Sequence, residues 1–354
     1  ALTGDDPGQR AAGGQWMGPV LAQILNPCAD GFVAAPFLFG PIIGPYSIRL
    51  WNWVHSEGGC PDSFLEVDWI GLGLIIDDDP TAMETFNEGT RLLGEFLLTK
   101  TKAEIADAAV EHRLLATPVA NTRDLLLSEH LSARGYWDDV GGQRQNGRFA
   151  VFGATPLSPL GPPPALGQHN QEISHRQPSE GHPAASGATD EAPLDGVKVL
   201  DFSWALAGPE VTRLLADFGA TVIRVETEVR PDPIRGSRPF IGETGGFENS
   251  VSWHTINAGK LSFPMDIGSA EVRPVLEDLV RWADVVVESF SAGVLDSHDL
   301  GAERLLELNP SLVVLSSTLA GQTGPLRELS GFGTTGAAIA GIYPTTGWPD
   351  RDPA

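Results

Sequence analysis

The second half of the chain alternates short apolar runs with amphipathic stretches, and no other feature constrains the fold as strongly. The apolar runs occupy residues 197–202, 221–225, 284–288 and 312–315. The stretches with helical spacing occupy residues 208–218, 269–282 and 302–308. Strands this uniformly apolar are expected where helices cover both faces of a parallel sheet. The pattern predicts an α/β fold: an open, doubly wound, Rossmann-like parallel sheet with its ligand crevice beyond the carboxyl ends of the strands.

A polar segment rich in Pro, Gly and Ser, from Gln171 to Pro193, separates this region from the first half. Its composition predicts an exposed linker. We therefore divide the chain into a first part of residues 1–170, a linker of residues 171–192, and a second part of residues 193–354.

The first part predicts a mixed α+β region. Thr81 with Glu84, and Thr101 with Glu104, fit the S/T-x-x-E capping box, so a helix is expected to begin at each threonine. Three further elements are predicted: a helix at 122–131 and strands at 136–140 and 149–152.

Composition excludes several classes of protein. A net charge of −23 repels nucleic acid, whose binding needs clustered Lys and Arg. No apolar stretch is long enough to span a bilayer, and no signal peptide is recognisable. Cys28 and Cys60 are too few for a disulfide framework, which predicts a cytoplasmic location. His169, His175 and His182 lie in or beside the linker with no usual zinc spacing, so no metal site is predicted.

The first strand-to-helix turn of the second part, residues 203–209, occupies the place of a dinucleotide-binding loop. That loop needs several glycines for close approach to a pyrophosphate. Here only Gly208 is present, and Pro209 removes one amide donor. The sequence of this turn therefore argues against a binding site for NAD or FAD.

The second part resembles a known family through many segments in one order. Its opening reads PLDGVKVLDFS, followed by LAGP and LLADFGATVIRVE, and then by Asn257 and Lys260. Further matches are ADVVVESF, GVL, LNP and GQTGP, within residues 283–325. These segments resemble the N-terminal part of class III coenzyme A (CoA) transferases, the CaiB/BaiF family.

The first part resembles the other end of the same family. Gly13-Gly14-Gln15 is similar to a glycine-rich loop that some members fold over the active site, and residues 29–33 are similar to the start of their small domain. The closing segment of the family matches residues 99–104, 118–119, 133–136 and 164–169, with Gln168 where a glutamate is usual. The resemblance implies a tandem fusion, with the end of one family copy preceding the beginning of a second.

The resemblance implies an enzyme that moves CoA from an acyl-CoA to a carboxylic acid acceptor. In the family an aspartate carboxylate attacks the thioester, and an acyl anhydride and an enzyme–CoA thioester follow. Neither a metal nor a redox cofactor is implied, and CoA is a substrate. The catalytic aspartate is expected beyond Ala354, so this fragment alone is expected to be inactive, and Asp350 and Asp352 are interpreted as loop charges.

The CoA site can be carried over by position onto residues at strand ends, where an open sheet binds its ligand. The candidate CoA-binding residues are Leu206, Ala207, Thr227, Arg235, Lys260, Met265, Asp266, Ser289 and Phe290. Arg235 and Lys260 are the candidate charge partners of the phosphates. Thr227 and Ser297 stand where members often have arginine, which is expected to weaken CoA binding in this copy.

Two other functions stay open. An α-methylacyl-CoA racemase uses the same fold with an acid and a base beside the α-carbon. Such racemases have Gly-His-Asp where this sequence has Gly331-Phe332-Gly333, which favours transfer. A noncatalytic CoA-binding or scaffolding copy is the third possibility. The resemblance also implies an interlocked dimer, or a pseudo-dimer within one polypeptide.

Overall fold

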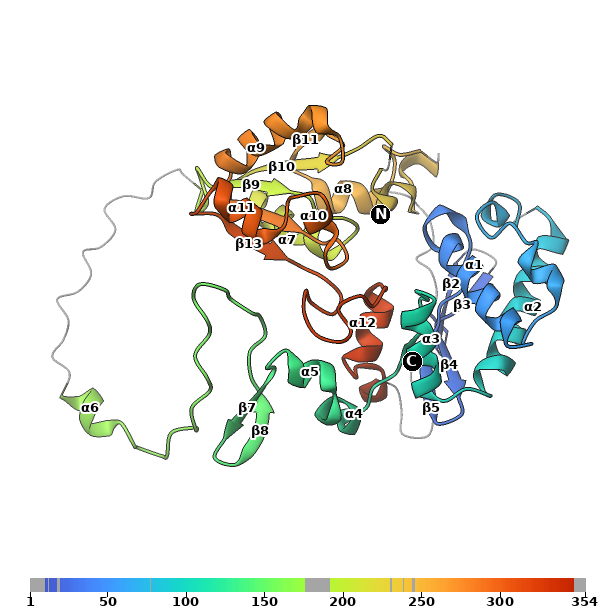
Figure 1. Ribbon diagram of the computed structural model, residues 1–354, viewed down its shortest axis with the longest axis horizontal. Helices are drawn as coiled ribbons and strands as arrows, with labels where there is room; N and C mark the ends of the chain where they lie inside the picture. Colours follow the sequence, from blue (N-terminus) through green and yellow to red (C-terminus); the bar gives the residue numbers. More distant parts are fainter. Residues whose placement is uncertain are drawn as a thin grey trace.

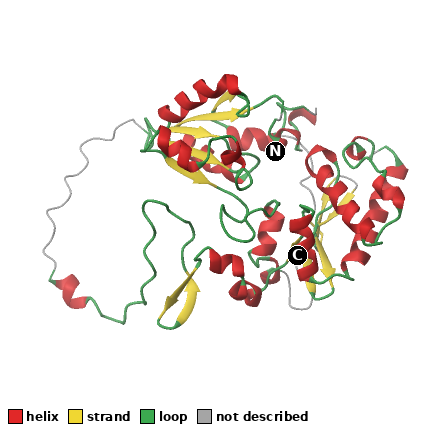
Figure 2. Cartoon of the chain, in the orientation of Figure 1, coloured by secondary structure: helices red, strands yellow, loops and turns green. Residues whose placement is uncertain are grey.

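The second part of the chain forms one parallel sheet. The structure, a computed structural model, describes residues 10–11, 13–17, 20–76, 78–175, 192–229, 231–237, 239–243 and 246–346. The strand order is β11-β10-β9-β12-β13, and every pairing is parallel (Figures 1 and 2). The strands are β9 (Lys198–Asp201), β10 (Thr221–Glu226), β11 (Leu261–Pro264), β12 (Val285–Glu288) and β13 (Val313–Ser316). The predicted α/β fold with an open parallel sheet is confirmed.

Helices and buried side chains cover both faces of the central strands. Val286 packs in one buried cluster with Leu200 and Leu276, whereas Val287 packs in another with Val199 and Val222. The helices are α7 (Ala207–Asp217), α8 (Val251–Asn257), α9 (Arg273–Trp282), α10 (Val294–Ser297) and α11 (Ala302–Leu308). Apolar strand residues at the centre therefore mark a two-sided core, as expected.

The edge strands depart from that expectation. On β13 the side chain of Val313 is 60% exposed and that of Leu315 is 40% exposed. All four residues of β11 are exposed as well. An apolar run therefore predicted a strand correctly without predicting cover on both of its faces.

The first part is a mixed α and β region around an aromatic core. Phe37 makes ring contacts with Trp51, Trp69 and Phe86, at centroid distances of 5.3, 5.2 and 4.8 Å. Two antiparallel sheets flank it: β1 (Arg10–Ala11), β2 (Gly14–Met17) and β3 (Val20–Gln23), and then β4 (Leu25–Cys28), β5 (Gly31–Ala34) and β6 (Thr117–Pro118). The helices of this region are α1 (Gly40–Ser56), α2 (Pro80–Leu97) and α3 (Lys102–Glu111).

Two helix starts were predicted in this region, and one is wrong. Thr101 caps α3 and makes both bonds of the capping box with Glu104, as predicted. The helix α2 instead begins two residues early, because the Asp79 carboxylate accepts the Thr81 amide and Pro80 occupies the first helical position. Aspartate caps a helix as well as threonine does, and proline is preorganised there.

Residues 122–152 differ from the prediction in two places. The single helix expected over 122–131 is two helices, α4 (Thr122–Leu127) and α5 (Glu129–Ala133), because the extended Ser128 ends the first and caps the second. The predicted strand at 136–140 is confirmed as β7 (Trp137–Val140). Its partner is the polar strand β8 (Gln143–Asn146), whereas the apolar residues 149–152 form no strand. A hairpin turn placed the partner strand directly after β7, which periodicity did not reveal.

The end of the described chain returns to the first part. The helix α12 (Gly333–Ile339) packs on β5 and β6, where Ala338 is buried with Leu25, Ala34 and Val119 (Figure 1). The Ala120 amide donates to the Ala338 carbonyl at 2.9 Å. The remaining helices are α6 (Asn170–Ser174) and the 3₁₀ helices η1 to η6 at 62–65, 72–74, 233–236, 241–243, 270–272 and 343–345. Across the described ranges, no helix has both the length and the hydropathy that a bilayer crossing needs.

Candidate functional site

The strand order locates the crevice of the sheet. From β9 the chain moves to β10 and β11 on one side, and then crosses to β12 and β13 on the other. The carboxyl ends of β9 and β12 therefore diverge at a topological switch point, which is where open α/β sheets bind their ligands.

Side chains and backbone from both strand ends meet at this switch point. The amide of Trp204, after β9, donates to the Ser289 hydroxyl at 2.7 Å, and the Trp204 and Phe290 rings lie 6.0 Å apart. Gly208 lets α7 approach this closely, because a Cβ there would lie 2.3 Å from Ser203 Cβ and 3.3 Å from Ser289 Cβ. Ala205 adopts a left-handed conformation with φ of 61° at the turn.

Four of the predicted CoA-binding residues gather around this point. Leu206 and Ala207 are exposed at the start of α7, and Ser289 and Phe290 are half-buried directly after β12. Thr227 follows β10, and Asp266 is exposed beyond the end of β11. Met265 is a core residue that packs with Leu200 and Val225. The role of all seven in CoA binding stays a prediction.

Arg235, a predicted phosphate partner, is held by protein groups in this structure. Its guanidinium donates to both Glu226 oxygens, at 2.8 and 3.0 Å, and to Glu248 at 3.0 Å. It also lies 3.5 Å from the centre of the Trp253 ring, a cation–π contact. Its role in CoA binding stays a prediction, and these contacts give it a structural role in addition.

Lys260, the other predicted charge partner, is buried. Its Nζ donates to Asp201 at 3.1 Å, to the Pro209 carbonyl at 2.8 Å and to Asn257 at 2.9 Å, which accounts for all three ammonium protons. Burial is the main cause that lowers the pKa of Lys260 to about 8, and the attraction of Asp201 opposes it. A ligand phosphate would have to compete with these three bonds.

The lowered pKa of Lys260 predicts a pH effect on stability. Between pH 8 and 10.5 the unfolded chain binds this proton and the folded chain does not, so the free energy of unfolding should rise with pH in that window. We expect the difference in unfolding free energy between the wild type and Lys260→Met to increase across it. Urea unfolding at several pH values measures that difference, and a constant difference would contradict the prediction.

The sequence analysis missed the centre of this charge network. Arg224, in the middle of β10, is 1% exposed and pairs with Asp232 and with Asp201, the latter at 3.6 Å. It also donates to the Ser203 carbonyl, and Asp232 accepts the Ala205 amide. The sequence did contain a signal for this network, since an arginine stands within the apolar run 221–225. A charge in a buried strand requires charged or polar partners. The network fixes the turn that follows β9.

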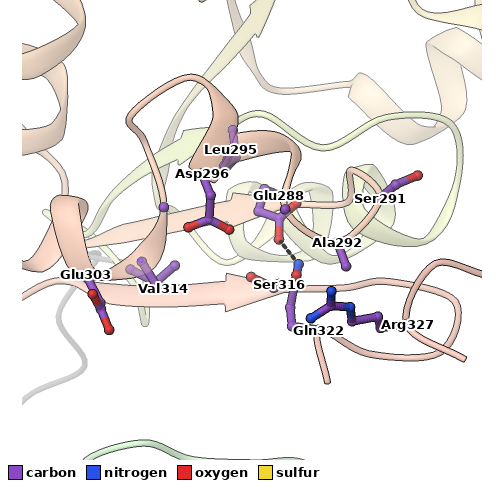
Figure 3. Close-up of a pocket in the computed structure, with 13 residues that line it drawn as sticks. Glu288, Ser291, Ala292, Leu295, Asp296, Glu303, Val314, Ser316, Gln322 and Arg327 are labelled. Carbon is purple, nitrogen blue, oxygen red and sulfur yellow. Dashed lines mark hydrogen bonds between the residues drawn. The ribbon is translucent and has the colours of Figure 1, made fainter. Parts of the chain in front are cut away.

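A cavity of about 330 Å³ lies next to the switch point, at the carboxyl ends of β12 and β13 (Figure 3). Its lining includes Glu288, Asp296, Glu303, Ser316, Gln322 and Arg327. None of the predicted CoA-binding residues lines it. Two of its lining residues, Glu288 and Ser291, directly precede and follow Ser289 and Phe290 in the sequence. The cavity therefore extends the crevice on the β13 side.

Glu288 is the buried carboxyl group of this cavity. It accepts the Phe290 amide at 2.8 Å and the Gln322 amide group at 2.9 Å. Burial is the main cause that raises the pKa of Glu288 above its usual range, and these hydrogen bonds oppose the rise. The carboxyl group therefore ties the end of β12 to the loop that follows β13.

Comparison with known proteins identifies the family to which this fold and crevice belong. The family model for CoA-transferase family III matches residues 73–170 and 194–354. The chain belongs to CoA-transferase family III. The two matched stretches are separated by the predicted linker. By the resemblance described above, the first stretch is similar to the C-terminal part of the family and the second to its N-terminal part.

Two relatives named as CoA-transferases agree with this assignment, and one solved structure is similar to part of the chain. The chain is 41% identical over 163 residues to the succinyl-CoA–D-citramalate CoA-transferase of Chloroflexus aurantiacus, an alignment that covers 46% of this chain and 39% of that protein. A protein of Mycobacterium tuberculosis named probable CoA-transferase is 28% identical over 349 residues, covering 95% of this chain and 41% of that protein. A CaiB/BaiF family structure from Brucella suis has 40% identity and a TM-score of 0.43, covering 46% and 43%. The chain thus spans about two fifths of the length of the curated relatives it matches.

Proposed function

We propose that the protein containing this chain transfers CoA from an acyl-CoA to a carboxylic acid, and that the switch point of this sheet binds the CoA. One observation carries the proposal: the turn after β9 and the end of β12, both matched to the family, meet through the Trp204–Ser289 hydrogen bond. Family membership and relatives named as CoA-transferases acting on succinyl-CoA and acetyl-CoA support it.

We expect the reaction to proceed through an aspartate beyond Ala354, on the basis of the resemblance to the family. Its carboxylate attacks the thioester carbon, the CoA thiolate leaves, and an acyl–enzyme anhydride forms. The thiolate then attacks the enzyme carbonyl and releases the donor acid, leaving an enzyme–CoA thioester. The acceptor carboxylate attacks that thioester, releases the CoA thiolate and forms a second anhydride with the enzyme. The thiolate then attacks the acceptor acyl carbon, which forms the product acyl-CoA and regenerates the aspartate carboxylate. Each step exchanges one acyl bond for another, so neither ATP nor a metal enters the balance.

We also infer a tandem arrangement of two family copies in one polypeptide. The family model matches two separate stretches, and the Mycobacterium tuberculosis relative aligns across both of them. The packing of α12 on β5 and β6 supports a pseudo-dimer, because it joins the later copy to the earlier one. The cytoplasmic location stays a prediction.

A noncatalytic scaffolding copy, with weakened CoA binding, is the second candidate. It is favoured by one observation: the donors of Arg235 and Lys260 are engaged by protein acceptors. Racemisation has less support, because Phe332 stands at the relevant position and contacts the Tyr46 ring at 6.2 Å instead of offering an acid or a base.

The proposed CoA site predicts a ligand preference that calorimetry can test. We expect the chain to bind CoA more tightly than NAD, because the dinucleotide glycines are missing at the turn after β9. Leu206→Glu, in that exposed turn, should weaken CoA binding by about tenfold or more, since it sets a negative charge against the phosphates.

The matched control is Leu306→Glu, the same change at an exposed leucine on α11. It should leave the affinity for CoA unchanged. Tighter binding of NAD than of CoA, or equal losses in the two variants, would contradict the proposed site.

A further inference from the structure

The ring of His130, on α5, bonds to both ends of one loop in the other half of the chain. Its Nε2 lies 2.8 Å from the Ala320 carbonyl oxygen, and its Nδ1 accepts the Leu326 amide at 3.1 Å. The carbonyl can only accept and the amide can only donate. The two bonds together therefore require a neutral ring with its proton on Nε2.

This ring is poorly placed to carry a charge. His130 is 8% exposed, and burial is the main cause that lowers its pKa, with a smaller effect of the nearby Arg134. Its other charged neighbours along the chain are Glu129 in α5, and Arg327 and Glu328 after the loop, which pair with each other at 3.4 Å. Protonation would put a second N–H on Nδ1, facing the Leu326 amide, and would break that bond.

The loop that His130 holds, residues 320–326, contributes Gln322 to the lining of the cavity beside the crevice. Gln322 in this loop bonds to Glu288 inside the cavity at 2.9 Å. Arg134 adds a bond to the Thr323 hydroxyl at 2.9 Å, and Gly324 lies so close that a Cβ there would be 2.7 Å from His130 Nδ1. The His130 bonds and the Gln322–Glu288 bond therefore hold the same loop, one on each side.

We propose that His130 is a positioning residue that holds the 320–326 loop against the first half while its ring is neutral, and that releases the loop when the ring is protonated. One family copy would then set the shape of the cavity in the other according to pH. The effect on a ligand rests on the proposed function, whereas the effect on the loop does not.

The sign of the pH dependence follows from the lowered pKa. When the loop is open, we expect the pKa of His130 to lie near its ordinary value of 6.5, whereas burial in the closed loop lowers this pKa. The closed loop is thus most stable above pH 6.5 and loses stability as the pH falls towards the lowered pKa.

Hydrogen exchange of the CoA-free chain tests the loop itself. Amide protection of residues 320–326, corrected for intrinsic exchange rates, is compared at pH 7.5 and pH 5.5. In the wild type we expect it to fall by up to about tenfold at the lower pH, because pH 5.5 lies one unit below the ordinary pKa of 6.5 and protonation of the ring favours the open loop. His130→Gln, whose amide donates and accepts without titrating, should keep the loop protected at both pH values. His130→Ala should leave it unprotected at both.

The amides of α9 report whether each variant is folded, and His55→Gln, a change at a histidine in an exposed pair with Asp62, should behave as the wild type. Equal protection of the wild type at both pH values, or the same loss in His130→Gln, would overturn the proposal. CoA affinity measured at the two pH values is a separate readout. If CoA does not bind at either pH, the proposed function fails while the loop result still stands.

Discussion

Replacing Arg224 by methionine should lower the free energy of unfolding of the second half by about 3–5 kcal/mol. The substitution leaves Asp232 without its ion pair and Asp201 with Lys260 as its remaining cation, and both carboxylates are buried. Breaking a buried pair from one side is more costly than replacing the whole pair, because an uncompensated charge stays behind. Urea unfolding measures the loss in free energy of unfolding, and hydrogen exchange of the β9 and β10 amides shows whether that loss affects this part of the sheet.

The control for Arg224 is Arg281→Met, on α9. Arg281 pairs with Glu277 and Asp278, both at 2.9 Å, but its own side chain is 48% exposed. Surface pairs of this kind are worth about 0–1 kcal/mol. If the two substitutions destabilised the sheet equally, the ion pairs around Arg224 would not be what fixes the turn after β9.

Gly208→Ala should destabilise the chain by about 1–3 kcal/mol, the usual cost of overpacking, and should also abolish CoA binding at the proposed site. The added methyl group would meet Ser203 Cβ at 2.3 Å, and neither backbone can yield without moving α7 away from β12. That movement separates Trp204 from Ser289, which is the contact that brings the two strand ends together. Thermal unfolding and CoA titration measure the two effects.

Gly236→Ala is the matched control, since a Cβ at Gly236 would meet no atom within 4 Å and its φ is not positive. Its stability should stay within about 1 kcal/mol of the wild type, because alanine restricts the unfolded chain without straining the fold. Unchanged CoA affinity in Gly208→Ala would show that the close approach of α7 to β12 is unnecessary for the ligand.

Periodicity predicted four of the five described strands of the parallel sheet, because each of these four shows its own apolar run. It missed β11, which reads Leu-Ser-Phe-Pro and is exposed throughout. It failed where the structure depends on a neighbour. The helix α2 starts at Asp79 and not at Thr81, since both residues can cap and only the geometry of Pro80 decides between them. Residues 149–152 are as apolar as a strand, but β8 had already paired with β7.

The sequence predicted where the candidate site lies in the fold, but it did not predict the ion pairs of the charged residues. The strand-end rule placed Ser289 and Phe290 beside the turn after β9, where the structure has them. It could not show that Lys260 and Arg235 are held by Asp201 and Glu226, because these partners lie on β9 and β10, in different elements from the two cations. Contacts between residues far apart in sequence carry no local pattern, and the His130–Ala320 bond joins residues 190 positions apart.

The packing of α12 on β5 and β6 also sets an order of events during synthesis. Ala34 and Val119, which α12 covers, leave the ribosome long before Ala338 does. At the usual rate of about 5–20 residues per second, the roughly 220 residues from Val119 to Ala338 take about 10–45 s. During that interval an apolar face of the first copy is open to chaperones or to another nascent chain, and it closes only when the second copy arrives.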